Sequence, residues 1–295
     1  NGMFPFNLGW DGVADGYYTL ASPYGFSENQ NIVHDIYPID EIPIQSDSHG
    51  IIYVAPDGTG NGSSWAQATS ELQLALFKST MDDSSIWVKE GTYTGKPGEN
   101  FAFTALFKCK LYGGFKGDET YDYDLSQRDF EAHPSILDGS QTQGVIGEIS
   151  NNDSLIIIDG FTIRNGNAMH GGGIRLESNM QIRNCKFCNN YASSSGGAAS
   201  QRSIDGARNI LIEDCEFFDN EASFGGDGAD FGNTTFIRCV FHDNQAQSSG
   251  GGVRCISHGS PSRFINCTFR NNTAQKGGGI AVAEKQGPTL WSCLI

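Results

Sequence analysis

Short stretches of alternating apolar and polar residues recur along the second half of the chain. In each stretch a cysteine and a phenylalanine are separated by one residue, and an asparagine, an alanine and a glycine cluster follow. Alternation with a period of two is typical of a strand that has one buried face. No segment between the cysteine and the glycine cluster has the i, i+3, i+4 spacing of a helix. The pattern therefore predicts short strands that are joined by tight turns.

These stretches align as an internal repeat that begins near Leu155. The anchor column of the alignment is Gly160, Cys185, Cys215, Cys239, Cys267 and Cys293, so successive anchors are 24 to 30 residues apart. Two residues after the anchor stand Thr162, Phe187, Phe217, Phe241, Phe269 and Ile295, of which Thr162 is the odd one out. Five residues after it stand Asn190, Asn220, Asn244 and Asn272, with Asn165 in register in the first repeat.

A repeat of this length, built from short strands, predicts a solenoid in which each repeat forms one rung. Equivalent residues of successive rungs then stack about 4.8 Å apart. We expect the phenylalanines to stack inside the solenoid. We expect the asparagines to pass amide hydrogen bonds from rung to rung, as in cross-β ladders.

Five of the eight cysteines lie in the anchor column and alternate with phenylalanine on the inward face. The favoured interpretation is a column of buried free thiols that act as small hydrophobic groups. Disulfides between neighbouring rungs are the alternative, but stacked Cβ atoms stay near the rung spacing, which exceeds the ~3.8 Å that a disulfide prefers. Cys185 and Cys188 form a CxxC sequence, yet positions i and i+3 of a strand face opposite ways. We therefore expect Cys185 inside and Cys188 outside near the turn, without a metal or redox site.

The region before the repeats predicts a cap for the solenoid. Ser70 followed by Gln73 resembles a capping box, and three apolar residues then share one helical face: Leu72, Ala75 and Leu76. A short helix near residues 70–80 would cover the open end of the first rung, whose core and sheet edge are otherwise exposed. Residues 1–50 carry no repeat. They are interpreted as an extended segment that packs on the first rungs, or as a linker from a preceding domain.

Two sets of motifs resemble known families. Residues 155–295 resemble the repeats of chlamydial-type polymorphic outer-membrane proteins, through the sequences FCNN, FFDN, FHDN and FRNN together with GGAA, GGGV and GGGI. Residues 51–165 resemble the N-terminal region of bacterial secreted β-helix proteins of the pectin-lyase-like superfamily. The matching stretches are IIYVAPDGTGNGSSWAQAT, IWVKEGTYTG, LYGGFKGDE, LSQRDFEAHPSILDGS and IIIDGFTIRNGNA.

The resemblance implies an all-β fold over residues 51–295: a single-stranded, right-handed parallel β-helix of about eight rungs with an N-terminal capping helix. It also implies a secreted protein or one on the bacterial outer cell surface. It does not assign an activity, because the superfamily includes lyases, hydrolases and adhesins.

Composition sharpens this picture. The chain has 38 glycines among 295 residues, and the repeats place many of them at one recurring turn. Its net charge is −15, and without a basic stripe a general nucleic-acid-binding protein is excluded. No run of 18 apolar residues occurs, so no transmembrane segment is expected.

Acidic residues provide two candidate metal or catalytic sites. Asp227 and Asp230, in the sequence GGDGADFGN at 225–233, resemble one nonapeptide of a calcium-binding β-roll. No second copy follows, and Gly232 stands where a large apolar residue belongs, so a solvated turn is favoured over bound calcium. Asp219 and Asp243 share a column and would stack at a spacing that suits a retaining glycosidase pair or a calcium site. Asn189 and Asn271 fill the same column, which favours a simple preference for turn geometry.

Basic residues and glycines provide two further candidates. A polysaccharide lyase would need an arginine or lysine base near carboxylates, but the outward arginines do not form one column: Arg175, Arg183, Arg238, Arg254, Arg263 and Arg270. His170, His242 and His258 each stand alone in the sequence and are interpreted as surface or turn residues. Gly58, Gly60 and Gly62 lack the Lys-Ser/Thr of a phosphate-binding loop, so a plain loop is expected. No catalytic residue, metal ligand or cofactor is therefore assigned.

The sequence thus favours a non-catalytic secreted or cell-surface protein, namely an adhesin, a glycan-binding protein or a component of a surface assembly. Its partner would be a surface glycan or a protein. The alternative is an enzyme, a polysaccharide lyase or glycoside hydrolase that acts on an acidic polysaccharide along a groove on one sheet. The last residues, SCLI, stop one strand into a rung. This predicts that further chain or a partner covers the open edge.

Overall fold

The computed structural model describes residues 3–6, 16–19, 43–105, 108–148, 155–176, 178–201, 209–224, 229–231, 234–256, 261–283 and 287–295. The chain forms two compact units, residues 1–42 and 43–295. In the first unit β1 (Met3–Phe6) pairs antiparallel with β2 (Gly16–Thr19). The second unit begins at Pro43, before the expected boundary at residue 51, and Ile44 is buried in it. Because the two units are not placed relative to each other, the packing of residues 1–50 on the first rungs stays a prediction.

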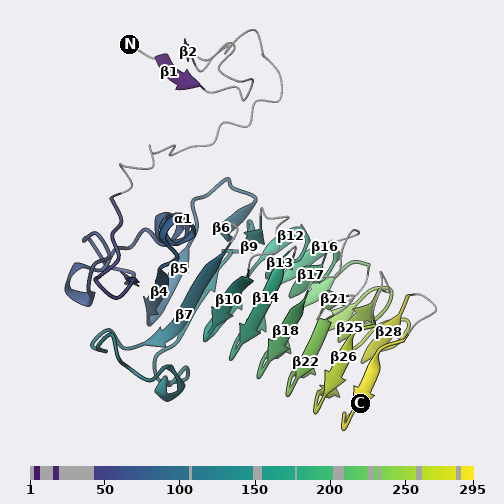
Figure 1. Cartoon of the computed structure of the whole chain (residues 1–295). Coiled ribbons are helices and arrows are strands. Elements are labelled where there is room, and N and C mark those ends of the chain that lie inside the picture. The colour runs from purple at the N-terminus through teal and green to yellow at the C-terminus, as the bar shows by residue number, and fades with distance from the viewer. Residues whose placement is uncertain are drawn as a thin grey trace. The chain divides into compact units, whose positions relative to one another are not determined.

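The second unit is a parallel solenoid whose turns have up to four strand-forming sides (Figure 1). The first sheet contains β3 (Ile51–Val54), β4 (Ser85–Lys89), β7 (Cys109–Phe115), β10 (Leu155–Asp159), β14 (Asn179–Arg183), β18 (Ile210–Glu213), β22 (Thr234–Ile237), β26 (Arg263–Ile265) and β29 (Thr289–Trp291). The second sheet contains β5 (Gly91–Thr94), β8 (Ser135–Asp138), β11 (Phe161–Arg164), β15 (Lys186–Cys188), β19 (Glu216–Phe218), β23 (Val240–His242) and β27 (Thr268–Arg270).

The third sheet contains β12 (Asn167–His170), β16 (Tyr191–Ser195), β20 (Glu221–Ala222) and β24 (Gln245–Ala246). The fourth sheet contains β6 (Phe101–Ala105), β9 (Gly144–Glu148), β13 (Ile174–Leu176), β17 (Ala199–Gln201), β21 (Ala229–Phe231), β25 (Val253–Cys255) and β28 (Ile280–Val282). Strand pairs between successive turns are parallel. The described chain makes about seven turns, since the second and fourth sheets have seven strands each, which is close to the expected eight.

The predicted helix is present as α1 (Leu72–Asp82), between β3 and β4 at the N-terminal end of the solenoid (Figure 1). Leu72, Ala75 and Leu76 are buried as expected. The predicted capping box is wrong, because the helix begins after Glu71 without a side-chain cap. The Gln73 amide instead hydrogen-bonds the backbone of Thr104 in β6, donating to its carbonyl (3.1 Å) and accepting from its N–H (2.8 Å). The described residues also include two short 3₁₀ helices, η3 (Trp65–Gln67) and η4 (Leu125–Gln127).

The register corrects the alignment of the first repeat by one residue. Ile163 pairs with Phe187, so it heads the phenylalanine column in place of Thr162. Gly160 is the turn residue before β11, with a φ of 88°, and it matches Asn184, whose φ is 51°. The sequence alignment placed this glycine in the cysteine column because it could not distinguish the turn residue from the buried residue that follows.

The two predicted inner columns are confirmed. Ring centroids lie 4.8, 4.7 and 4.8 Å apart, within 7° of parallel, along Phe187, Phe217, Phe241 and Phe269. Beside them Asn190 donates to Asn220 (3.0 Å), Asn220 to Asn244 (2.9 Å) and Asn244 to Asn272 (2.9 Å) through their side-chain amides. The first repeat contributes Gly166 rather than Asn165 to this ladder, because its backbone N–H donates to Asn190 Oδ1 (2.8 Å).

The eight cysteines are free thiols, as predicted. Four of the five anchor cysteines are buried, and their sulfurs face backbone carbonyls, as Cys239 Sγ does with Ile212 O at 3.4 Å. Burial raises the pKa of the Cys215 and Cys239 thiols well above the ordinary value. These thiols therefore act as core groups rather than as nucleophiles.

The C-terminal turn presents apolar side chains to solvent. Trp291, Leu294 and Ile295 are all exposed. That further chain or a partner covers this edge stays a prediction. Within the described residues, no helix is long and apolar enough to span a membrane.

Candidate functional site

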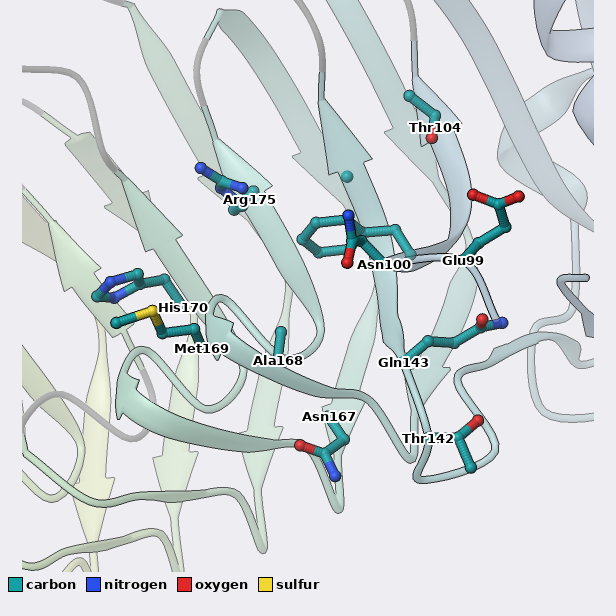
Figure 2. A pocket seen from close by; sticks show the side chains of 12 residues that line it. Glu99, Asn100, Thr104, Thr142, Gln143, Asn167, Ala168, Met169, His170 and Arg175 are labelled. Atoms are coloured by element: carbon teal, nitrogen blue, oxygen red, sulfur yellow. The ribbon is translucent and has the colours of Figure 1, made fainter. Parts of the chain in front are cut away.

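An open groove of about 620 Å³ lies on the outer face of the fourth sheet, beside β12 of the third sheet (Figure 2). One wall carries Glu99 and Asn100, and the opposite wall carries Met169 and His170. Arg175 projects from β13 between them. The groove thus brings side chains from three successive turns to one surface.

The floor of the groove is an aromatic ring on a glycine surface. Phe101 in β6 pairs with Gly144 in β9, and its ring lies over that neighbouring strand. A Cβ atom at Gly144 would lie 2.4 Å from the ring, and one at Gly147 would lie 2.6 Å from it. The Arg175 guanidinium lies 5.9 Å from the ring centroid, within cation–π range. Both glycines are therefore needed to seat the ring that Arg175 contacts.

Backbone hydrogen bonds fix the wall that carries Glu99 and Asn100. Gln143 is buried, and the orientation of its side-chain amide that satisfies its surroundings lets the NH₂ group donate to the carbonyl oxygens of Lys96 (3.0 Å) and Glu99 (3.1 Å). The N–H of Gly144 donates to Asn100 O (3.0 Å). This wall is consequently attached to β9 rather than left as a loose loop.

The opposite wall is β12, the first strand of the third sheet. Asn167 donates from its side chain to Gln141 O (3.0 Å), and His170 Nδ1 lies 3.1 Å from Ser195 Oγ of the next turn. Met169 lies between them and is 67% exposed. Side chains alternate along β12, so Met169 points outward like Asn167. The register between β12 and β16 shifts at this point.

Comparison with known proteins identifies the fold family. The family described as the right-handed β-helix region matches residues 126–295, which is more than half of the chain. The chain belongs to the right-handed β-helix family. No curated protein matches it significantly. Among solved structures, it is similar to the crystal structure of Escherichia coli YbhC, with 13% identity and a TM-score of 0.40, over 85% of this chain and 70% of that chain.

Two of the candidate residues from the sequence, His170 and Arg175, line the groove of this β-helix. Arg254 lies in the same outward row as Arg175, three turns further along. Arg183 and Arg238 belong to another side, where both form ion pairs with Glu213. As predicted, the arginines do not form one column. Of the six, Arg175 is the one that lines the groove.

The acidic column has a structural explanation. Asn189, Asp219, Asp243 and Asn271 all have φ between 52° and 56°, the left-handed conformation that asparagine and aspartate tolerate best. This agrees with the interpretation as turn geometry. The calcium candidate of residues 225–233 lies outside the described side chains, as does His258.

The CxxC sequence and the glycine-rich loop of residues 58–62 both have structural roles. Cys185 is inside and Cys188 is on the outer face, in register with Arg164 and Phe218, which leave it buried. Burial raises the pKa of the Cys188 thiol. A Cβ at Gly60 would lie 2.3 Å from Gln67 O, so this glycine lets two backbone segments pack together in an ordinary loop. Within the described chain, no group of three histidine, cysteine or acidic side chains is arranged to hold a metal.

His242 is not isolated, although the sequence suggested so. On the second sheet its Nε2 lies 2.9 Å from Glu216 Oε1 of the previous turn, and its Nδ1 lies 2.6 Å from Asp243 Oδ2. Its ring also stacks on Phe218, at 5.2 Å between centroids. The histidine therefore connects two turns on the outer surface. The repeat alignment held a signal for this contact. Glu216 shares a column with Val240, two residues before His242 on the same face of the strand, so the two side chains are diagonal neighbours on adjacent turns.

This contact predicts an acid-sensitive contribution to stability. The hydrogen bond from His242 lowers the pKa of Asp243 below its ordinary value of 3.8. A carboxyl with a depressed folded-state pKa stabilises the fold above about pH 4, and this stabilisation is lost as the pH falls through the folded-state pKa. Chemical denaturation between about pH 7 and pH 3 should show a smaller loss of stability for Asp243→Asn than for wild type.

Asp219→Asn is the matched control, since Asp219 has the same turn conformation but follows Phe218 instead of a histidine. It should leave the acid dependence closer to that of wild type. Equal pH profiles for Asp243→Asn and wild type would show that the His242 contact contributes nothing.

Proposed function

We propose that this β-helix is a carbohydrate-binding protein, secreted or on the cell surface, whose groove holds a glycan without cleaving it. The observation that carries the proposal is the Phe101 and Arg175 pair on the groove floor, with polar side chains on both walls. Ligand sites combine an apolar surface with a few fixed polar groups that orient the ligand. A sugar ring offers the same combination, an apolar ring face edged by hydroxyl groups.

The polar groups of the groove suit hydroxyl recognition. Asn100 and Asn167 supply amide groups that both donate and accept, Glu99 supplies an acceptor, and Arg175 supplies several donors. The backbone bonds that fix Glu99 and Asn100 reduce the entropy lost on binding. Membership of the right-handed β-helix family is consistent with a surface or carbohydrate-related role.

Charge favours a neutral glycan over an acidic one. The protein has a net charge of −15, and within the groove the Glu99 carboxylate offsets the positive charge of Arg175. A polyanion would approach against this field, which salt screens only in part. A neutral polysaccharide meets no such repulsion.

The groove also bears on the enzymatic alternative. Most glycoside hydrolases place two carboxylates on either side of the bond they cleave. Among the described residues that line the groove, Glu99 is the one carboxylate. This favours binding over hydrolysis, and product release remains the test of the alternative.

Calorimetric titration with xylan, glucomannan and mixed-linkage β-glucan, with polygalacturonate as the polyanionic comparison, tests the proposal. We expect a neutral glycan to bind, and Arg175→Ala to weaken its binding roughly ten- to hundredfold, as the loss of a charged hydrogen-bond donor implies. Arg263→Ala is the control of equal charge, since Arg263 is exposed on the first sheet.

Three results would overturn the proposal. The first is that no glycan binds, and the second is that Arg175→Ala and Arg263→Ala bind alike. The third is that new reducing ends or unsaturated sugars accumulate, which would establish the enzymatic alternative. Thermal unfolding of both variants confirms that each is folded.

A further inference from the structure

Two large apolar side chains are exposed on the same side of the solenoid, at the third sheet. Met169 is 67% exposed and Phe224 is 69% exposed. Met169 also lines the groove, so the exposed apolar surface begins at the groove itself. Phe224 follows β20, two turns further toward the C-terminus.

Backbone hydrogen bonds place Phe224 in a column that runs along the solenoid. Its N–H donates to Ser194 O of the previous turn (2.8 Å), and its carbonyl accepts from Ser249 N of the next turn (3.3 Å). In parallel strands these bonds set Phe224 level with Ser195, which pairs with His170, and level with Ser248 of the next turn. Met169 directly precedes His170 in β12. We call Met169, His170, Ser195, Phe224 and Ser248 the corner ridge. At about 4.8 Å a turn, Phe224 lies roughly 10 Å along the axis from Met169.

The fold does not explain Phe224. Its column neighbours are the serines Ser195 and Ser248, so this position needs no large side chain. Its ring is exposed, whereas Phe217 in the same turn is fully buried. Beside it Tyr191 Oη lies 3.1 Å from Ser223 Oγ, which sets hydroxyl groups next to the exposed ring. An aromatic face next to fixed hydroxyl groups is again a combination that suits a sugar ring.

We propose that the groove and the corner ridge form one continuous site for a linear neutral polysaccharide that runs along the solenoid axis, with Phe224 as a second stacking position. This inference rests on the proposed function and adds the ligand class, a polymer rather than a single sugar. The groove holds one part of the chain, and the ridge holds a part beyond Met169. Affinity therefore rises with the length of the glycan until the glycan reaches Phe224.

Titration with cello-, xylo- and manno-oligosaccharides of increasing length tests this inference. In wild type the affinity should rise with length. Phe224→Ala should leave the short oligomers unchanged and weaken the long ones about three- to tenfold, the range of an aromatic contact. Arg175→Ala should weaken every length. Tyr121→Ala is the matched control, since it removes another exposed aromatic side chain of the same unit.

The outcomes separate the ridge from the groove. If Arg175→Ala weakens binding but Phe224→Ala binds like wild type at every length, the corner ridge does not bind the glycan. The groove would then remain the binding site. If no oligomer of the three series binds, both fail. If Phe224→Ala changes the sedimentation of the protein and not its sugar affinity, the ridge is a contact between copies of the chain, which also overturns the inference.

Discussion

Replacing Phe241 with alanine should lower the free energy of unfolding by about 3–5 kcal/mol. The ring is fully buried and stacks between Phe217 and Phe269 at 4.7 and 4.8 Å. The edges of Phe236 and Phe264 meet it from the adjacent column, at 5.5 and 6.3 Å. Alanine would leave a cavity between turns that the rigid strands on both sides cannot close. Denaturant unfolding followed by circular dichroism measures the loss.

Phe218→Ala is the control for this prediction. Phe218 neighbours Phe217 in sequence but stacks on His242 on the outer face of the second sheet, so it should cost clearly less than Phe241→Ala. Solenoids can unfold in local units, which changes the slope of the denaturant unfolding curve as well as its midpoint. Both the slope and the midpoint are therefore compared between the two variants. Equal losses for the two variants would contradict the buried phenylalanine column.

Asn244→Ala should cost about 3–5 kcal/mol, although it removes only one small side chain. The Asn244 amide donates to Asn272 Oδ1 and to Phe217 O, both at 2.9 Å, and its Oδ1 accepts from the Asn220 amide at 2.9 Å. Asn244 has no exposed surface, so water cannot replace these bonds. Each buried polar group left unpaired costs about 1–3 kcal/mol, and the costs here are shared within one ladder.

Gln245→Ala is the matched control, because Gln245 is the next residue and is exposed. It should change stability by no more than about 0.5 kcal/mol. A result in which both variants unfold together with wild type would mean that the asparagine ladder does not hold the turns together.

The inner columns were predictable from the sequence because parallel turns put equivalent residues in contact. Phe187, Phe217 and Phe241 recur at one position of the repeat, and only stacking keeps such a position constant. The first repeat was misaligned by one residue because Gly160 serves as a turn residue where later repeats have asparagine, aspartate, arginine or serine. A glycine carries no side chain that would mark its place in the column.

The groove could not be predicted in the same way. Phe101 and Gly144 lie before the recognisable repeats, so no column of the alignment contains them. Arg175 was a candidate, but its partner became visible only once the register of β6, β9 and β13 was known. The one signal in the sequence was the pair Gly144 and Gly147 within a single strand, where glycine is unfavourable unless another group approaches closely.

The position of a bound oligosaccharide tests the central claim most directly. Crystals soaked with a cello-, xylo- or manno-oligosaccharide that binds in solution should show the sugar against Phe101 and Arg175, with the chain continuing past Met169 toward Phe224. A sugar bound elsewhere, such as the outer face of the second sheet beside Glu216 and His242, would contradict the groove as the binding site.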